Sequence, residues 1–194
     1  MSVRALISVV TAALLVSACA SPVERQLAES ARTLAPAAAG GERSFEQLIT
    51  FSHEEHSQQF IAAGEICDGA MTLALLSPEG LEVLRLRHDA EGVHTRVRRE
   101  LPEWLESETI LADMQFVLWP AEALEQAWGP SWSLREDARG RTLLRDDQSW
   151  ARADFNGDPW QGGARLEHLR FGYRLEIRTL HHEITDTDTE QPCR

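Results

Sequence analysis

The sequence predicts a mainly β fold in which an antiparallel sheet is folded around one helical insert. Hydrophobic and polar residues alternate along most of the chain beyond residue 44, a pattern typical of antiparallel strands with one buried face. Only residues 103–128 show a long helical period. With 194 residues, 43% of them hydrophobic, the chain is long enough for one domain with a sizeable core.

The first eighteen residues are predicted to be a signal peptide, because Arg4 precedes a short apolar run that is too short to span a membrane. The segment Val16-Ser17-Ala18-Cys19 resembles the lipobox of bacterial lipoproteins. This resemblance implies cleavage after Ala18 and acylation of Cys19 with fatty acids such as palmitate. Because Ala20 follows the cysteine, it also implies sorting to the periplasmic face of the outer membrane. The alternative is an ordinary secretory cleavage site.

Residues 19–43 are rich in Ala, Ser, Pro and Gly, and we expect a lipidated flexible tether. The net charge of the whole chain is −12. No basic patch with interleaved aromatic residues is evident, so nucleic acid is excluded as a partner. The acidic balance also argues against adsorption to anionic lipid by charge. The outer membrane is therefore expected to hold the protein through its acyl anchor.

The half-barrel domain is predicted to span residues 44–180. Its first strands follow from alternation, since Phe45, Gln47, Ile49 and Phe51 share one face. Further strands are expected over residues 60–67, 71–75, 81–88 and 93–98, separated by polar turns.

The helical insert carries one apolar stripe, formed by Ile110, Leu111, Met114, Val117 and Leu118. Trp119-Pro120 should interrupt the helix, because the residue before a proline disfavours α geometry. We expect Leu111, Met114, Leu118 and Trp119 to face the sheet beside a ligand cavity. Trp128 and Trp132 should lie near the rim of that cavity. The alternative is that the stripe is plain core packing.

After the insert, the clearest strand is the last one. Leu169, Phe171, Tyr173, Leu175 and Ile177 alternate with polar residues. We expect Phe171, Tyr173 and Leu175 to contribute to the cavity. Residues 181–194 are interpreted as a polar tail.

Two cysteines remain after lipidation of Cys19. Cys67 and Cys193 are expected to lie in an oxidising compartment and are candidates for a disulfide. The alternative is a buried Cys67 and a free thiol in the tail.

Catalytic and metal-binding motifs are missing from the sequence. In His53-Glu54-Glu55-His56 the histidines have the wrong spacing for a zinc helix. Asn156-Gly157 is a hairpin-turn signal rather than part of a calcium loop. No nucleophile elbow or phosphate-binding loop is present. We therefore expect no cofactor, no metal and no enzymatic activity.

The segment Ile110-Leu111-Ala112-Asp113-Met114-Gln115-Phe116-Val117-Leu118-Trp119-Pro120 resembles the signature of a family of uncharacterised bacterial lipoproteins, often encoded beside aryl polyene biosynthesis enzymes. Residues 76–80, 141–146 and 172–177 resemble that family in the same order. The family is similar to the lipoprotein carrier LolA and receptor LolB. The resemblance implies a curved antiparallel half-barrel covered or plugged by helices, with an apolar lining that holds acyl chains.

The expected function is therefore non-covalent carriage or acceptance of an acylated or polyene lipid, or of a lipoprotein, with protein partners of lipid export. The alternative is an assembly module that fills its half-barrel with its own helix and binds proteins at the rim. A lipid-tailoring enzyme is the third hypothesis.

Overall fold

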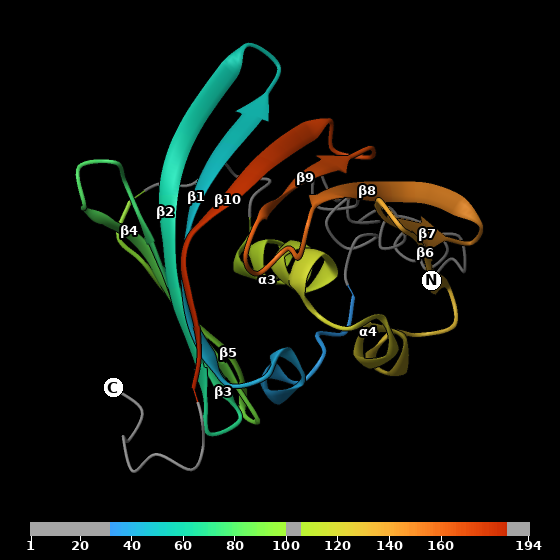
Figure 1. The fold of residues 1–194 in the computed structure, drawn as a ribbon, viewed down its shortest axis with the longest axis horizontal. Helices are drawn as coiled ribbons and strands as arrows, with labels where there is room; N and C mark the ends of the chain where they lie inside the picture. Colours follow the sequence, from blue (N-terminus) through green and yellow to red (C-terminus); the bar gives the residue numbers. More distant parts are fainter. Residues whose placement is uncertain (1–31, 100–105, 186–194) are drawn as a thin grey trace, which may run out of the picture. The chain divides into compact units, whose positions relative to one another are not determined.

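The computed structural model describes residues 32–99 and 106–185. These residues form one sheet of ten strands in the order β5-β4-β3-β2-β1-β10-β9-β8-β7-β6. Every neighbouring pair is antiparallel. The sheet is open and curved, and the helix α3 (Ser107–Leu118) lies on its concave side (Figure 1). The predicted fold class is thereby confirmed.

The strands are organised as two meanders. The first consists of β1 (Arg43–His53), β2 (His56–Cys67), β3 (Ala70–Leu76), β4 (Glu82–Asp89) and β5 (Gly92–Val97). The second consists of β6 (Trp132–Asp137), β7 (Gly140–Arg145), β8 (Gln148–Asn156), β9 (Gly163–His168) and β10 (Tyr173–Ile184). The first and last strands pair at the centre of the sheet, so β5 and β6 form its two edges.

The helical segment connects these two edges. The helix α3 ends at Leu118, because the next residue, Trp119, has an extended ψ of 152° that breaks the helix before Pro120. A second helix, α4 (Ala121–Ala127), follows it. A proline suits the start of a helix but disfavours helical geometry in the residue before it, which explains the break. No described helix is long and apolar enough to cross a membrane.

The C-terminal end of α3 is held by Arg141 from β7. Its Nη1 donates to the carbonyl oxygens of Phe116 at 2.9 Å and Trp119 at 2.7 Å. Its Nη2 lies 2.7 Å from a carboxyl oxygen of Glu136. A positive side chain here satisfies helix carbonyls that lack partners within the helix and complements the helix dipole. Arg141 therefore fixes α3 to the second meander.

The segment before β1 packs into the domain, which corrects the prediction of a tether through residue 43. Ala35 and Ala37 are 0% and 2% exposed, and Ala37–Gly40 forms the short 3-10 helix η2. The amide of Gln115 donates to the carbonyl of Ala35 and accepts from its N–H, both at 2.8 Å. These alanines are small enough to pack closely against α3. The Ala-rich composition that suggested a linker is therefore explained by this packing.

Gly40 shows how close this packing is. A Cβ at this position would lie 2.6 Å from Cδ1 of Ile66 and 2.7 Å from the ring of Trp119. Any side chain here would displace a fully buried aromatic residue. Only glycine fits at position 40, because Ile66 and Trp119 approach its backbone so closely.

The last strand differs from its prediction at both ends. Residues 169–172 form a turn between β9 and β10, closed by an N–H of Gly172 that donates to the carbonyl of His168 at 2.8 Å. β10 then continues to Ile184, where it pairs with Arg43. Residues 169–171 alternate like a strand but lie in a turn. The predicted polar tail, residues 181–194, begins too early, because β10 extends to Ile184.

Two short motifs behave as surface turns. His53 and His56 face each other across the β1–β2 hairpin, with Glu54 in a left-handed conformation. Asn156-Gly157 opens a longer loop rather than a two-residue turn, because β9 starts at Gly163. No group of three potential metal ligands occurs among the described residues.

Cys67 ends β2 and forms a disulfide. The other cysteines, Cys19 and Cys193, lie outside the described residues. Pairing of Cys67 with Cys193 therefore stays a prediction, as do the cleavage at Ala18 and the acylation of Cys19.

Candidate functional site

An apolar pocket lies between α3 and the concave face of the first meander. The volume of its cavity is about 70 Å³. The pocket is lined by Gln47, Ile49, Phe51, Phe60, Ala62, Leu73, Leu75, Ile110, Asp113, Met114, Val117, Leu118, Tyr173, Leu175 and Ile177. This volume is well below that of typical small-molecule pockets, about 300 to 1,000 Å³.

The period of two along the strands builds one wall of the pocket. On β1, Ile49 lies opposite Phe60 on β2 and opposite Ile177 on β10. Phe51 lies opposite Leu175. Residues that face each other across strands project to the same side of a sheet, so these side chains form one continuous apolar surface.

The period of 3.6 along α3 builds the other wall. Ile110, Met114 and Val117 recur on the same face of the helix and line the pocket. Ile110 and Met114 remain half-buried, whereas Val117 is 1% exposed.

The residues proposed for the cavity fall into two groups. Met114, Leu118, Tyr173 and Leu175 line the pocket. Leu111 and Trp119 are fully buried but do not line it. Core packing, the alternative interpretation of the helix stripe, therefore describes these two residues.

The remaining candidates lie on the side of the second meander. Trp128 is buried, and Trp132 is half-buried with its ring 5.3 Å from that of Trp150. Phe171, in the turn before β10, stacks on His168 with ring centroids 4.4 Å apart. None of the three lines the pocket.

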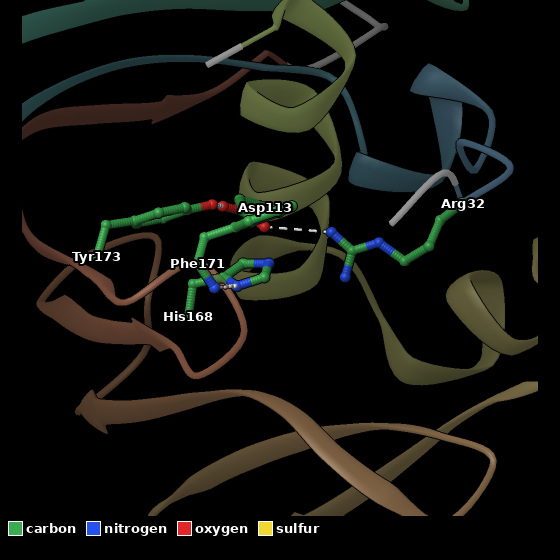
Figure 2. Close-up of polar contacts among 5 residues, drawn as sticks. All are labelled: Arg32, Asp113, His168, Phe171 and Tyr173. Carbon is green, nitrogen blue, oxygen red and sulfur yellow. Dashed lines mark hydrogen bonds and ion pairs between the residues drawn. The ribbon is translucent and has the colours of Figure 1, made fainter. Parts of the chain in front are cut away.

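A buried polar cluster centres on Asp113 of α3 (Figure 2). One carboxyl oxygen accepts a short hydrogen bond from the hydroxyl of Tyr173. The other lies 3.1 Å from Nη2 of Arg32, and both of these side chains are 3% exposed. The cluster therefore joins α3 to β10 on one side and to the segment before η2 on the other.

Figure 2 places Arg32 and Tyr173 on opposite sides of Asp113. The guanidinium of Arg32 lies 5.4 Å from the ring centre of Trp132 and 6.0 Å from that of Trp128. Cation–π contacts of this length contribute to holding a desolvated guanidinium. Nε and Nη1 of Arg32 are buried without a hydrogen-bond partner. The ion pair thus links elements rather than exposing charge to the pocket.

Burial shifts the acidity of Tyr173 and His168. Desolvation raises the pKa of Tyr173 well above its usual value, and the neighbouring Asp113 raises it further. Desolvation lowers the pKa of His168 to about 4, partly opposed by Asp113. The backbone N–H of Phe171 donates to Nδ1 of His168 at 3.2 Å, which requires an unprotonated Nδ1. Both side chains are therefore neutral near pH 7.

His168 should make the stability of the domain depend on pH. Its folded pKa is about 4, below its ordinary value of 6.5, so the unfolded chain binds more protons between these values. The free energy of unfolding should fall as the pH decreases through this window, by about 3 kcal/mol in total from this residue. Urea unfolding across the window should show a flatter pH dependence for His168→Gln than for the unmodified chain. Parallel curves would contradict the assignment.

The polar residues of this site were not predicted from the sequence. Asp113 lies three residues after Ile110 and four before Val117, so it interrupts the apolar stripe on its own face. That interruption was the available signal. Arg32 gave none, because its partner Asp113 is 81 residues away in the sequence. His168 contacts Phe171 and Tyr173 close by in the sequence, but this spacing did not single it out.

The apolar residues around the pocket can bury a hydrocarbon chain. The polar contact at the pocket is the hydrogen bond between Tyr173 and Asp113. Because aliphatic and aromatic side chains are in the majority, the pocket suits an apolar ligand chain rather than a charged one.

The model of a family described as "Protein of unknown function (DUF3261)" matches residues 44–181. A search of curated proteins gave no match. Among solved structures, the chain is similar to the Pseudomonas aeruginosa MucA/MucB complex, with 15% identity and a TM-score of 0.38. That alignment covers 79% of this chain and 56% of the other, so this chain spans little more than half of it.

Two further structures show a similar degree of likeness. A putative outer membrane lipoprotein-sorting protein domain from Vibrio parahaemolyticus has 6% identity and a TM-score of 0.40, covering 87% of this chain and 93% of that one. A DUF1329 family protein from Desulfovibrio piger ATCC 29098 has 10% identity and a TM-score of 0.29, covering 87% and 92%. Likenesses this distant carry no information about ligand or activity. The match over residues 44–181, in contrast, spans well over half of the sequence, and the chain belongs to the family described as "Protein of unknown function (DUF3261)".

Proposed function

We propose that this protein is a lipid-anchored periplasmic carrier or acceptor of an acylated or polyene lipid at the outer membrane. The observation that carries the proposal is the apolar pocket between α3 and strands β1, β2, β3 and β10. Binding proceeds by reversible burial of a hydrocarbon chain, without covalent chemistry. Its free energy comes from apolar area, on the order of 25 cal/mol per Å², less the cost of ordering ligand and protein.

The walls of the site support an apolar ligand. Its two walls come from different periodic elements, the α3 face around Met114 and the strand face around Ile49 and Leu75. The helix wall is fixed from behind, by Arg141 at its end and by Gln115 at the segment before η2. A pocket with a fixed wall loses little entropy on binding, which favours affinity.

The test is binding of a fluorescent fatty acyl probe and of a polyene probe to the chain without residues 1–19. This truncation removes none of the described residues. We expect saturable binding of at least one probe, and native mass spectrometry of protein purified from cells should reveal a bound lipid. If a folded chain binds neither probe and carries no lipid, the protein is better explained as an assembly module whose sheet is filled by α3.

The anchor is tested separately with Cys19→Ser. Because the thiol of Cys19 is the proposed acyl acceptor, this variant should leave the outer-membrane fraction and appear as soluble or uncleaved protein. Cell fractionation measures the change, with the unmodified chain as the control. Unchanged outer-membrane fractionation of Cys19→Ser would refute the lipoprotein assignment.

A further inference from the structure

The convex face of β4 and β5 carries a basic patch, defined here as Arg85, Arg87, His94 and Arg96. Arg85 lies directly opposite Arg96, and Arg87 directly opposite His94. The neighbouring residues Leu84 and Leu86 are 0% exposed on the concave side, so the patch projects to solvent from the other face. The side chains of Arg85, Arg87 and His94 are 51%, 55% and 61% exposed.

The acidic partners of this patch lie at its ends. Glu82 is 2.6 Å from Nη2 of Arg85, and Asp89 is 2.7 Å from Nε of Arg87 and 3.6 Å from Nε2 of His94. Arg96, between them, has no ion-pair partner among the residues that the structure describes. The centre of the patch is therefore positive although the whole chain carries −12.

The convex face of the second meander is arranged in the opposite way. Across β8, β9 and β10, Arg152 faces Glu167, which in turn faces Arg174. In the next row, Arg165 on β9 faces Asp154 on β8 and Glu176 on β10. Arg165 and Glu176 approach to 2.8 Å, and Arg174 and Glu167 to 3.5 Å. Opposite charges thus face each other at every position of this lattice.

This contrast within one sheet points to a role for the patch. Like charges directly opposite each other on neighbouring strands are destabilising, whereas opposite charges stabilise the pair. Charged side chains on an edge strand protect it from aggregation. Charges of alternating sign would give the same protection without repulsion between neighbouring strands. Arg96 faces Arg85 and has no ion-pair partner among the described residues, so an anionic group from outside the chain would relieve this repulsion.

From this arrangement we infer that the basic patch docks the domain onto the anionic headgroups of a phospholipid surface. The side chains project from the outer face of two strands, and the three best-formed pockets of the described residues do not include them. A flat array of long cationic side chains fits a layer of phosphates better than it fits one peptide in a groove. The overall acidic charge restricts this attraction to an orientation in which the patch faces the surface.

Vesicle co-sedimentation tests the inference with the chain lacking residues 1–19, which has no acyl anchor. Vesicles of phosphatidylcholine alone are compared with vesicles of equal parts phosphatidylcholine and phosphatidylglycerol at low ionic strength. Binding should require phosphatidylglycerol and disappear with added salt. The double variant Arg85→Gln/Arg96→Gln should bind about thirtyfold more weakly, since each basic residue near an anionic surface contributes a factor of about five.

The matched control is Arg165→Gln/Arg174→Gln, which removes the same charge from the convex face of the second meander. It should retain most of the binding. Equal loss in both double variants, or no binding by the unmodified chain, would overturn the inference. In the latter case an acidic protein becomes the partner to seek. Arg96→Gln alone should also weaken binding without lowering the melting temperature, because it removes repulsion and no ion pair with a described residue.

Discussion

Replacing Met114 with Asp should abolish binding of the acyl probe. Met114 is half-buried on the α3 wall of the pocket, between Ile110 and Leu118. A carboxylate at this position would have to lose its water when a hydrocarbon chain enters, a cost of several kcal/mol that exceeds the gain from the ligand's apolar surface. A fluorescence titration of the probe should show no saturable binding by this variant.

Two variants make the result specific. Met114→Ala keeps the pocket apolar and should weaken binding only several-fold, because lost contacts are small next to a buried charge. Gln126→Asp adds a carboxylate on the exposed face of α4 and should bind like the unmodified chain. Circular dichroism identifies unfolded variants. Full binding by a folded Met114→Asp chain would show that the ligand does not enter this pocket.

Replacing Trp119 with Ala should destabilise the domain by about 3 to 5 kcal/mol, the range for deleting a large buried aromatic side chain. Trp119 is 0% exposed and packs against Trp160, with ring centroids 5.8 Å apart. Its Nε1 donates to the carbonyl of Pro36 at 3.1 Å. The change therefore leaves a cavity and removes one of the two hydrogen bonds to the carbonyl of Pro36, which also accepts from the N–H of Ala39. Urea unfolding would measure this as a lower free energy of unfolding.

Trp119→Phe retains part of the ring but cannot donate the hydrogen bond, and it should cost less than the alanine variant. Because Trp119 does not line the pocket, the folded fraction of either variant should bind the probe with nearly unchanged affinity. A selective loss of affinity in Trp119→Phe, with stability intact, would instead place this residue in the ligand site.

The sequence predicted those features that depend on short-range patterns. The stripe from Ile110 to Leu118 and the break at Trp119-Pro120 were predicted because helix periodicity and proline geometry act over a few residues. The pocket residues Met114, Leu118 and Leu175 could be named because they share a face with other apolar residues. Trp119 follows the apolar stripe directly in the sequence, but the helix ends before it and it does not line the pocket. Helix periodicity alone does not predict this difference.

Other features depend on contacts between residues far apart in the sequence. The ion pair between Arg32 and Asp113 and the pair of hydrogen bonds between Ala35 and Gln115 join segments about eighty residues apart. The alanines before η2 look like a linker until Gln115 is placed beside them. The start of β10 was misassigned for a related reason, since strand pairing with β9 decides that Leu169 lies in a turn.

The pairing of β1 with β10 has a consequence for how the protein folds. The chain must bring its first strand beside its last one, and contacts of such high sequence separation slow folding. Until Tyr173 and the residues after it are available, β1 has one open edge beside an apolar face that includes Phe51. An unpaired apolar edge of this kind invites pairing with another chain. We therefore expect chains shortened before β10 to aggregate, while the complete chain folds only once its C-terminal strand has arrived.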